Sequence, residues 1–374
     1  MKSRICDLLG IDFPLLAFSH CRDVVAAVSR AGGFGVLGVT GFTPEEIDVE
    51  LKWIDDHVDG KPYGVDVLIP ENLSIRADGL SGAKLAEKIP QAHRDFVKGL
   101  LKSHDVEPPE VGFKGSDGTI AVTPAESLKR LEVAFRHPIR LIANALGVPP
   151  KEMIEMGRAH GVPVAALVGA AEHAVRQVEA GVDIIVAQGT EAGGHCGEVS
   201  TMVLIPEVVR AVKRVRDVPV LAAGGIMTGR QMAACMAMGA AGAWTGSVWL
   251  ATVESETTEI FREKMVAARS RDTVRSKGRT GKYSRQLKSA WTEAWEGPDS
   301  PGALPMPLQS MISEPMLRAA DKAAAKGNPK ARELVTYFVG QGVGLVESVR
   351  SSREVVQSFM EEFAEAVQDM NELL

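Results

Sequence analysis

Eight short apolar runs recur along the first two thirds of the chain, and this rhythm constrains the fold more than any other feature. Continuous apolar runs are typical of strands buried on both faces, and strands that alternate with helices form a parallel sheet. We therefore predict a (β/α)8 TIM barrel, and an open doubly wound sheet is the alternative because strand order is not visible in a sequence. The runs are residues 13–18, 34–39, 62–69, 139–143, 162–167, 182–187, 218–222 and 243–245.

The segments between the runs divide the chain. RDVVAAVSRAGG and AAEHAVRQVEAG have apolar residues at helical spacing and end on glycine, as helices commonly do. We expect a barrel domain over 1–255, interrupted by a polar insertion at about 71–123 that contains one helix near 83–103. Residues 256–325, rich in charge, Trp and Pro, are expected to form a smaller, mainly helical substrate or lid domain. Residues 326–374 should pack back on the barrel, with an amphipathic helix over 348–374.

Composition excludes several classes of protein. The 42 basic and 48 acidic residues give a net charge of −6, and no basic block stands out, which argues against nucleic acid and anionic membranes as partners. The 4 cysteines have no CxxC spacing, so we expect no metal site and no disulfide framework, and a cytoplasmic protein. The uncharged stretch 232–253 is long enough for a membrane span, but its Gly, Thr and Ser residues favour a buried barrel element.

Glycine-rich loops follow the last three runs. In a TIM barrel these loops lie at the C-terminal ends of the strands, where active sites form. The loops after the last two strands commonly bind phosphate through backbone N–H groups. Gly224 and Gly225 in AAGGIMTGRQ, with Gly246 and Ser247 in WTGS, therefore predict a phosphate cradle. The alternative is that these glycines only serve tight barrel turns.

One histidine stands out among the 8 in the chain. His195 lies in AQGTEAGGHCG after the sixth run, among glycines that give it no packing role. An imidazole, with an ordinary pKa near 6.5, can take or return a proton around neutral pH. We predict a catalytic role for His195, in which it takes or returns a proton. His20, after the first run, is a second candidate, and Cys196 is a weaker one as a redox thiol.

AQGTEAGGHCG, together with VPVLAAGGIMTGRQMAACMAMGAAGAWTGSVWL, resembles the signature of the nitronate monooxygenases, FMN-dependent TIM-barrel enzymes. Flavin-dependent enoyl-acyl carrier protein reductases and some NAD(P)H:quinone reductases share this motif. The resemblance covers about 13–254, and AAVSRAGGFGVLG matches the family's first helix and second strand. It implies FMN, with its phosphate on the predicted cradle and His195 as base or proton donor near the flavin ring. It further implies flavin contacts from Gln188, Gly193, Gly194, Ala17, Phe18 and Ser19.

Three loops depart from the family pattern. Asp66 in YGVDVLIP stands where the family has an asparagine that contacts the flavin. A carboxylate there disfavours an anionic reduced flavin unless the carboxyl is protonated or paired. The loop after the fourth run reads IANALGVPP and the loop after the first reads SHCRD. We expect substrate contacts from Asn144 and His20, and from Gln341 in GQGVG, a segment expected to return to the barrel mouth.

The function predicted from this resemblance is FMN-dependent oxidation of alkyl nitronates, with O2 as the electron acceptor. The alternative is an NAD(P)H-dependent flavin reductase that acts on quinones or enoyl thioesters. A non-catalytic flavin or phosphosugar binding protein is a third class. The expected partners are a small-molecule substrate and O2, with NAD(P)H in the alternative. A homo-oligomer is compatible with the sequence.

Overall fold

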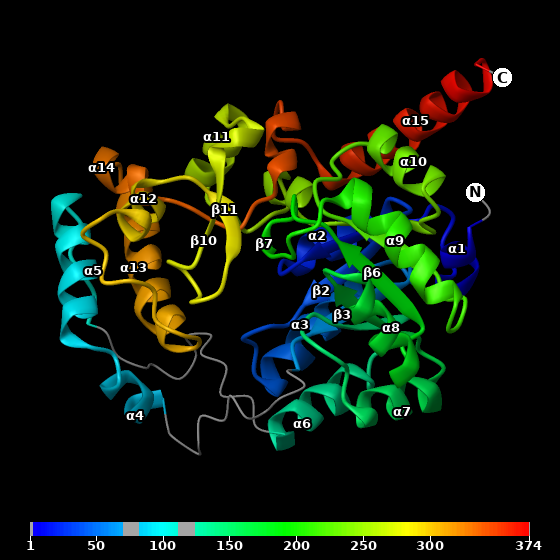
Figure 1. The fold of residues 1–374 in the computed structure, drawn as a ribbon, viewed down its shortest axis with the longest axis horizontal. Helices are drawn as coiled ribbons and strands as arrows, with labels where there is room; N and C mark the ends of the chain where they lie inside the picture. Colours follow the sequence, from blue (N-terminus) through cyan, green and yellow to red (C-terminus); the bar gives the residue numbers. More distant parts are fainter. Residues whose placement is uncertain (1–2, 70–81, 111–123, 374) are drawn as a thin grey trace.

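The computed structural model describes residues 3–69, 82–110 and 124–373. Within them, eight parallel strands close into a barrel in the order β1-β2-β3-β4-β5-β6-β8-β9. Figure 1 shows this barrel, with β2, β3 and β6 labelled, among the surrounding helices. Each strand falls on one of the eight predicted apolar runs, so the TIM barrel is confirmed and the open sheet is excluded. The strand bounds are β1 Leu15–Ser19, β2 Phe34–Gly38, β3 Tyr63–Val67, β4 Leu141–Asn144, β5 Val164–Val168, β6 Ile184–Gln188, β8 Val220–Ala223 and β9 Gly242–Thr245.

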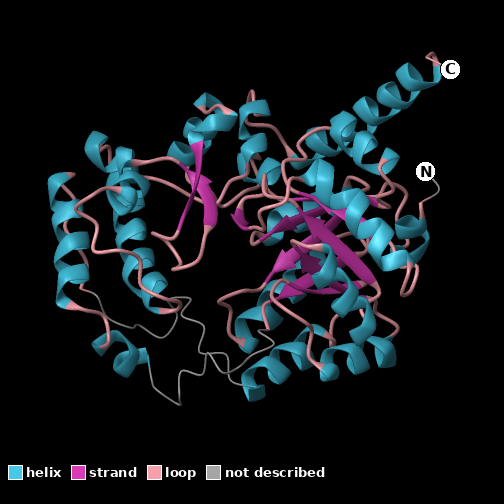
Figure 2. Ribbon diagram, in the orientation of Figure 1, coloured by secondary structure: helices cyan, strands magenta, loops and turns pink. Residues whose placement is uncertain are grey.

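Helices surround the barrel and make up most of a second unit beside it (Figure 2). The α-helices are α1 Arg4–Leu9, α2 Arg22–Arg30, α3 Pro44–His57, α4 Gly82–Glu87, α5 Gln91–Ser103, α6 Pro124–Ala134, α7 Lys151–His160, α8 Ala171–Ala180, α9 Thr201–Lys213, α10 Gly229–Ala237, α11 Glu259–Ala267, α12 Ala290–Glu296, α13 Leu308–Ala325, α14 Pro329–Leu334 and α15 Ser352–Asn371. The 3-10 helices are η1 Ser247–Ala251, η2 Ser270–Asp272 and η3 Gln341–Leu345.

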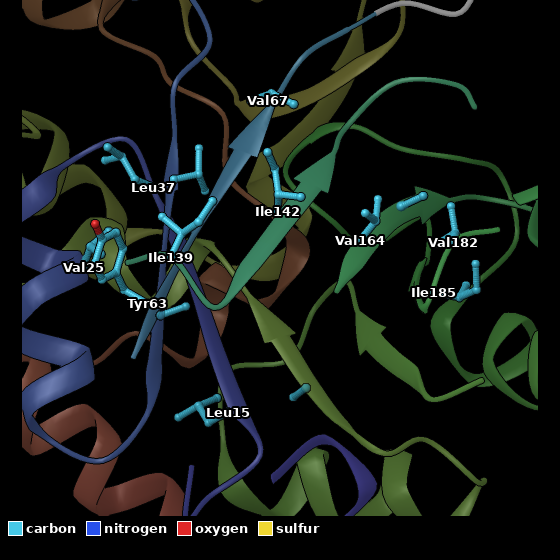
Figure 3. Packing of buried hydrophobic residues seen from close by; sticks show 14 of the residues in the cluster. Leu15, Val25, Leu37, Tyr63, Val67, Ile139, Ile142, Val164, Val182 and Ile185 are labelled. Atoms are coloured by element: carbon cyan, nitrogen blue, oxygen red, sulfur yellow. The ribbon is translucent and has the colours of Figure 1, made fainter. Parts of the chain in front are cut away.

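Two apolar layers hold the barrel together. Alternate strand residues such as Leu16, Val36 and Val186 fill the interior, and Ile5 and Leu9 of α1 close its N-terminal end. The intervening residues pack outward against the helices, as Figure 3 shows for Leu15, Tyr63, Ile142 and others. Because neighbouring residues of a strand point to opposite faces, this division also decides which side chains at the strand ends can face the barrel mouth.

The C-terminal helix α15 completes the ring of helices. It packs between α10, which follows β8, and α2, which follows β1. This is the place of the helix that should follow β9. The chain leaves the barrel after η1 and returns where Thr252 pairs with Arg350, so the intervening residues form an insertion within the last β/α unit.

The second unit draws on two insertions. Its core gathers Leu85, Val97 and Leu101 from the insertion after β3 with residues from Ala251 to Val343, among them Trp291 and Ile312. A three-stranded antiparallel sheet joins it to the barrel: β10 (Thr273–Ser276), β11 (Ser284–Leu287) and β7 (Gly194–His195), in the order β10-β11-β7. The smaller domain expected over 256–325 stays a prediction as a unit, and this second core extends beyond its expected end.

The single helix predicted over 83–103 is wrong. Two helices, α4 and α5, lie there, and Pro90 is the N-cap of α5 with extended backbone angles. A proline cannot continue a preceding helix, so the chain turns before it. The rest of the expected insertion, 71–81 and 111–123, lies outside the described residues. In the described part of the chain, no helix is long and apolar enough to span a bilayer.

Candidate active site

The loop after β6 is bound to the second unit through β11. Its residues Gly194 and His195 form β7, in which His195 pairs with Ser284 and Gly194 with Arg285. The Arg285 guanidinium also donates to the Thr190 carbonyl from Nε, at 3.0 Å, and from Nη2, at 2.9 Å. A loop with four glycines is flexible on its own, and these contacts fix its position above the barrel.

The imidazole of His195 is held at one nitrogen. Its Nε2 lies 2.8 Å from the Thr280 Oγ1, and its ring centre is 6.3 Å from that of Phe338. Loss of hydration and the positive charge of Lys282 lower the pKa of His195, although the residue keeps an exposed face. A lowered pKa leaves the ring neutral at pH 7, which is the form that can accept a proton.

His20 lies at the same end of the barrel. Its Nδ1 is 2.7 Å from the Gly38 carbonyl oxygen, and its ring meets Phe18 edge to face at 5.1 Å. Burial lowers the pKa of His20, and this residue, too, keeps an exposed face. An exposed face among surroundings that remove hydration is typical of a side chain that lines a recess. Both histidines therefore line the C-terminal mouth of the barrel.

Asp66 is a buried carboxyl group beneath that mouth. It lies on the inner face of β3, two residues after Gly64, and pairs with Gly38 and Ala143 of the neighbouring strands. Its exposure is 2%, and its Oδ1 has no hydrogen-bond partner among the described residues. Burial raises the pKa of Asp66 to about 8. The side chain is therefore a neutral acid at pH 7, able to donate a hydrogen bond as an asparagine amide does.

Strand alternation separates the residues predicted at the end of β1. Ala17 belongs to the outer layer and is fully buried, so its side chain cannot face the mouth. Phe18 faces inward and stacks on Trp244 of β9, with ring centres 6.3 Å apart. The Ser19 Oγ accepts from the Cys21 backbone N–H at 3.1 Å. Of the three, only Phe18 offers its side chain to the mouth, and the other two offer backbone at most.

The backbone conformation of the loop after β8 is by itself a reason for glycine at positions 224 and 225. Gly224 and Gly225 adopt φ values of 103° and 75°, which favour glycine with or without a phosphate. A Cβ at Gly225 would also lie 3.0 Å from the Glu191 Cβ. Gly246, after β9, differs because a Cβ there would meet nothing within 4 Å and its φ of −129° is open to other residues. Of these three glycines, Gly246 is the one that borders free space.

Backbone hydrogen bonds bring the segment 340–344 to these loops. The Gly340 N–H donates to the Ser247 Oγ at 2.8 Å, and the Gln341 N–H donates to the Glu191 carbonyl at 2.8 Å. A Cβ at Gly193 would lie 2.8 Å from the Gly340 nitrogen. Gly193 thus permits close packing of two chain segments, whereas Gly194 has a φ of 71° and open space around it. The expected return of GQGVG to the barrel mouth is confirmed.

Glu191 is a residue that the sequence analysis missed. Its carboxylate accepts from the Thr201 backbone N–H at 2.9 Å and from the Thr201 Oγ1 at 2.8 Å, at the start of α9. The same Oγ1 lies 2.9 Å from the Gly224 carbonyl oxygen. Glu191 therefore ties the loop after β6 to the start of α9, and Thr201 lies between Glu191 and the loop after β8. A negative charge at a helix N-terminus, where backbone N–H groups are unpaired, is favourable.

Asn144 does not face the mouth. Its exposure is 0%, its Oδ1 accepts from the Ile69 N–H at 2.9 Å, and its Nδ2 donates to the Ile69 and Leu146 carbonyls at 3.1 Å. Alternation along β4 turns the side chain outward, where it ties two loops together. The expected substrate contact from Asn144 is therefore corrected to a structural role.

The hairpin of β10 and β11 was also missed as part of the site. It supplies Thr280 and Lys282, and residues 269–288 contain eight Lys or Arg and one Asp, so the statement that no basic block stands out is wrong. The high local density of basic residues in this hairpin can be read from the sequence, but the negative net charge of the whole chain drew attention away from it. The pairing of this hairpin with His195 was not visible, because it joins residues 85 positions apart.

Comparison with known proteins identifies the family. The model of the family described as "Nitronate monooxygenase" matches residues 2–362. The chain belongs to the nitronate monooxygenase family. It is a flavin-dependent oxidoreductase that acts on small molecules. A Mycobacterium tuberculosis protein named "Putative monooxygenase Rv1533" is 52% identical over 379 residues, covering 100% of both chains.

Two solved structures resemble this family member. The nitroalkane oxidase from Streptomyces ansochromogenes is 26% identical with a TM-score of 0.78, covering 98% of this chain and 99% of its own. FabK from Thermotoga maritima is 25% identical with a TM-score of 0.73, covering 100% of both chains. Both likenesses cover nearly the whole chain, the barrel and the second unit together.

Proposed function

We propose that the protein oxidises alkyl nitronates, with FMN as its flavin and O2 as the electron acceptor. The observation that carries this proposal is His195, a neutral imidazole with one nitrogen free of hydrogen bonds to described residues, at the barrel mouth of a nitronate monooxygenase family member. Bound FMN would take electrons from the substrate and pass them to O2. The protein's own residues bind the flavin, shape the mouth and move the proton.

The flavin phosphate is proposed to lie on Gly224, Gly225, Gly246 and Ser247. The free space at Gly246 supports this, as does Ser247, whose Oγ accepts from Gly340 and keeps its own proton to donate. The N-terminus of α10 is less suitable for an anion, because the Glu362 carboxylate already accepts from the Gly229 N–H there at 2.8 Å. Two glycine loops offer room for one terminal phosphate, so FMN is preferred to FAD.

Gly246 gives a clean test of this cradle. In Gly246→Val the new side chain meets no protein atom within 4 Å of its Cβ, so the flavin-free fold should keep its melting temperature. We expect the purified variant to lose most of its flavin, while the wild type releases FMN on heat denaturation. Gly99→Ala, at an equally open glycine in α5, is the control and should keep its flavin. Full flavin content in Gly246→Val, or release of FAD, would contradict the assignment.

The flavin ring is proposed to lie against the inward-facing residues at the strand ends. Phe18 and Gln188 are in reach by alternation along β1 and β6, and Gly193 and Gly194 border the ring from the loop after β6. The unpartnered Asp66 Oδ1 would find its hydrogen-bond partner on the flavin. As a neutral acid it would not oppose an anionic reduced flavin, which resolves the conflict expected for a carboxylate. His20 and Gln341 are proposed as substrate contacts.

His195 is proposed to remove the α-proton of a neutral nitroalkane, or to stabilise the charge of a bound nitronate. General base catalysis contributes about 10²- to 10⁴-fold, so His195→Asn should lose activity on the neutral nitroalkane by that factor. Activity on the pre-ionised nitronate should fall much less, because its proton has already gone. Flavin content should not change, since other loops hold the phosphate. Equal losses on both forms would show that His195 binds charge and does not move a proton.

The likeness to FabK over the whole chain favours one second candidate, an NAD(P)H-dependent flavin reductase. Anaerobic stopped-flow spectroscopy separates the two functions. Propionate 3-nitronate should bleach the flavin absorbance within the turnover time, and NADH or NADPH should bleach it far more slowly. Rapid reduction by a nicotinamide nucleotide, with none by the nitronate, would replace the proposed function by the alternative.

A further inference from the structure

The hydroxyl group of Thr280, in the second unit, makes the one hydrogen bond between the His195 imidazole and the described residues. The Thr280 Oγ1 lies 2.8 Å from His195 Nε2, and it lies 3.0 Å from the Lys282 carbonyl oxygen and 3.3 Å from the Lys282 nitrogen. Thr280 is buried, with 7% exposure, so water does not compete freely for these bonds. The three contacts fix the position of the hydroxyl oxygen within the turn between β10 and β11.

The single proton of this hydroxyl determines which nitrogen of the neutral imidazole is protonated. A threonine hydroxyl has one proton to donate and two lone pairs to accept with. If it donates to the Lys282 carbonyl, it accepts from the Lys282 N–H and must also accept from His195. Every group then has a partner. If it donates to His195 instead, the Lys282 carbonyl loses its bond. The first arrangement requires the proton of neutral His195 to reside on Nε2.

We infer that Thr280 is a positioning residue that holds His195 in the Nε2–H tautomer and makes Nδ1 the nitrogen that receives the substrate proton. Nδ1 has no hydrogen bond to any residue in the described part of the chain, and the ring keeps an exposed face. The hydrogen bond at Nε2 fixes which nitrogen is basic, because in a neutral imidazole one nitrogen carries the proton and donates while the other is unprotonated and accepts. This inference rests on the proposed role of His195 as a base.

The surroundings of the ring support this arrangement. On the sheet, His195 shares its face with Ser284 and Ser276, which are neutral, while Arg275 and Arg285 lie on the opposite face. Phe338 packs from the segment that follows α14, and Cys196 is the titratable chain neighbour. Lys282 is the charged group that acts on the ring, and it lowers the pKa. Among these groups, the Thr280 oxygen is the acceptor that meets the imidazolium formed after proton transfer.

The first test determines the tautomer of His195 and needs no activity measurement. Long-range 1H–15N NMR of the holoenzyme, with the His195 signals assigned by their loss in His195→Asn, should show Nε2 protonated and Nδ1 unprotonated in the neutral ring. Thr280→Val keeps the shape of the side chain and removes the oxygen, so both tautomers should appear. Thr280→Ser restores the hydroxyl and should restore the single tautomer. Protonation at Nδ1 in the wild type would overturn the inference.

The second test uses the pH profile of kcat/KM on a neutral nitroalkane. Loss of the acceptor for the imidazolium should lower the pKa of the rising limb in Thr280→Val and lower its plateau about tenfold, with recovery in Thr280→Ser. If Thr280 had only a structural role, Thr280→Val would change stability but leave the tautomer and the pH profile as in the wild type. That result would refute the inference. If the wild type does not oxidise nitroalkanes, the proposed function fails while the NMR result still decides the tautomer.

Discussion

At the scale of single residues, burial gives the Asp66 carboxyl group the hydrogen-bonding properties of an asparagine amide. The barrel interior around it is apolar, and Oδ1 has no partner among the described residues, so the charged form is strongly disfavoured. The resulting neutral carboxylic acid carries a donor and an acceptor, as an asparagine side chain does. The same burial makes Asp66 costly to fold at neutral pH, because the unfolded chain would release the proton there.

This cost gives a pH-dependent prediction for the flavin-free protein. The pKa of Asp66 is about 8 in the folded chain, against about 3.9 for an ordinary aspartate, so between these values the folded chain holds a proton that the unfolded chain has lost. The free energy of unfolding therefore falls as pH rises through this window, by on the order of 5 kcal/mol in total, and Asp66 causes no further change above it. Asp66→Asn should remove the dependence and be more stable than the wild type at pH 8.

Urea unfolding of the flavin-free protein between pH 4 and 9 measures this effect. The difference in free energy of unfolding between Asp66→Asn and the wild type should be small at pH 4 and grow with pH. Asp56→Asn, which makes the same substitution at an exposed position of α3, is the matched control. A constant difference at every pH would mean that Asp66 does not keep its proton in the folded chain.

At the scale of elements, α15 closes the ring of barrel helices. Its contact with α10 leaves no room for a side chain at Gly229. A Cβ at Gly229 would lie 2.1 Å from the Phe359 carbonyl oxygen and 2.6 Å from the Phe363 nitrogen, both of them backbone atoms. Gly229→Ala must therefore push the two helices apart, at about 1–3 kcal/mol or more for such overpacking. Denaturant unfolding should show this loss. Gly99→Ala, inside α5 with open space around it, should instead gain about 0.5–1 kcal/mol. Equal effects of the two substitutions would contradict the packing argument.

The sequence predicted those elements whose pattern is local. All eight barrel strands were found, because burial on both faces leaves continuous apolar runs. The break at Pro90 was overlooked because the apolar spacing continues on both sides of it. The site was predicted where glycines and His195 mark the loops. Thr280, Glu191 and the outward turn of Asn144 could not be predicted, since each depends on strand alternation or on contacts between distant segments.

At the scale of the whole molecule, charge is distributed unevenly. The chain carries −6 in total, yet residues 269–288 carry eight basic residues and one acidic residue. Three of these charges are engaged with other described residues: Arg279 pairs with Glu314 at 2.7 Å, Arg275 pairs with Glu198 at 4.0 Å, and Arg285 donates to the Thr190 carbonyl. Lys277 and Lys282 remain exposed on the turn that holds Thr280. The hairpin therefore places positive charge beside His195 on an otherwise negative molecule.

An anion approaching His195 should be attracted by this hairpin, and a neutral molecule should not. We predict that kcat/KM for a nitronate falls as ionic strength rises, whereas the value for the neutral nitroalkane stays nearly constant, because salt screens exposed charges over about 10 Å at 0.1 M. Lys282→Gln should lower kcat/KM for the nitronate roughly threefold at low salt and have little effect at high salt. Lys213→Gln makes the same change in net charge at the end of α9 on the far side of the barrel, and it should leave both values unchanged. If the two lysine variants behave alike, the steering comes from the charge of the whole molecule and not from the hairpin.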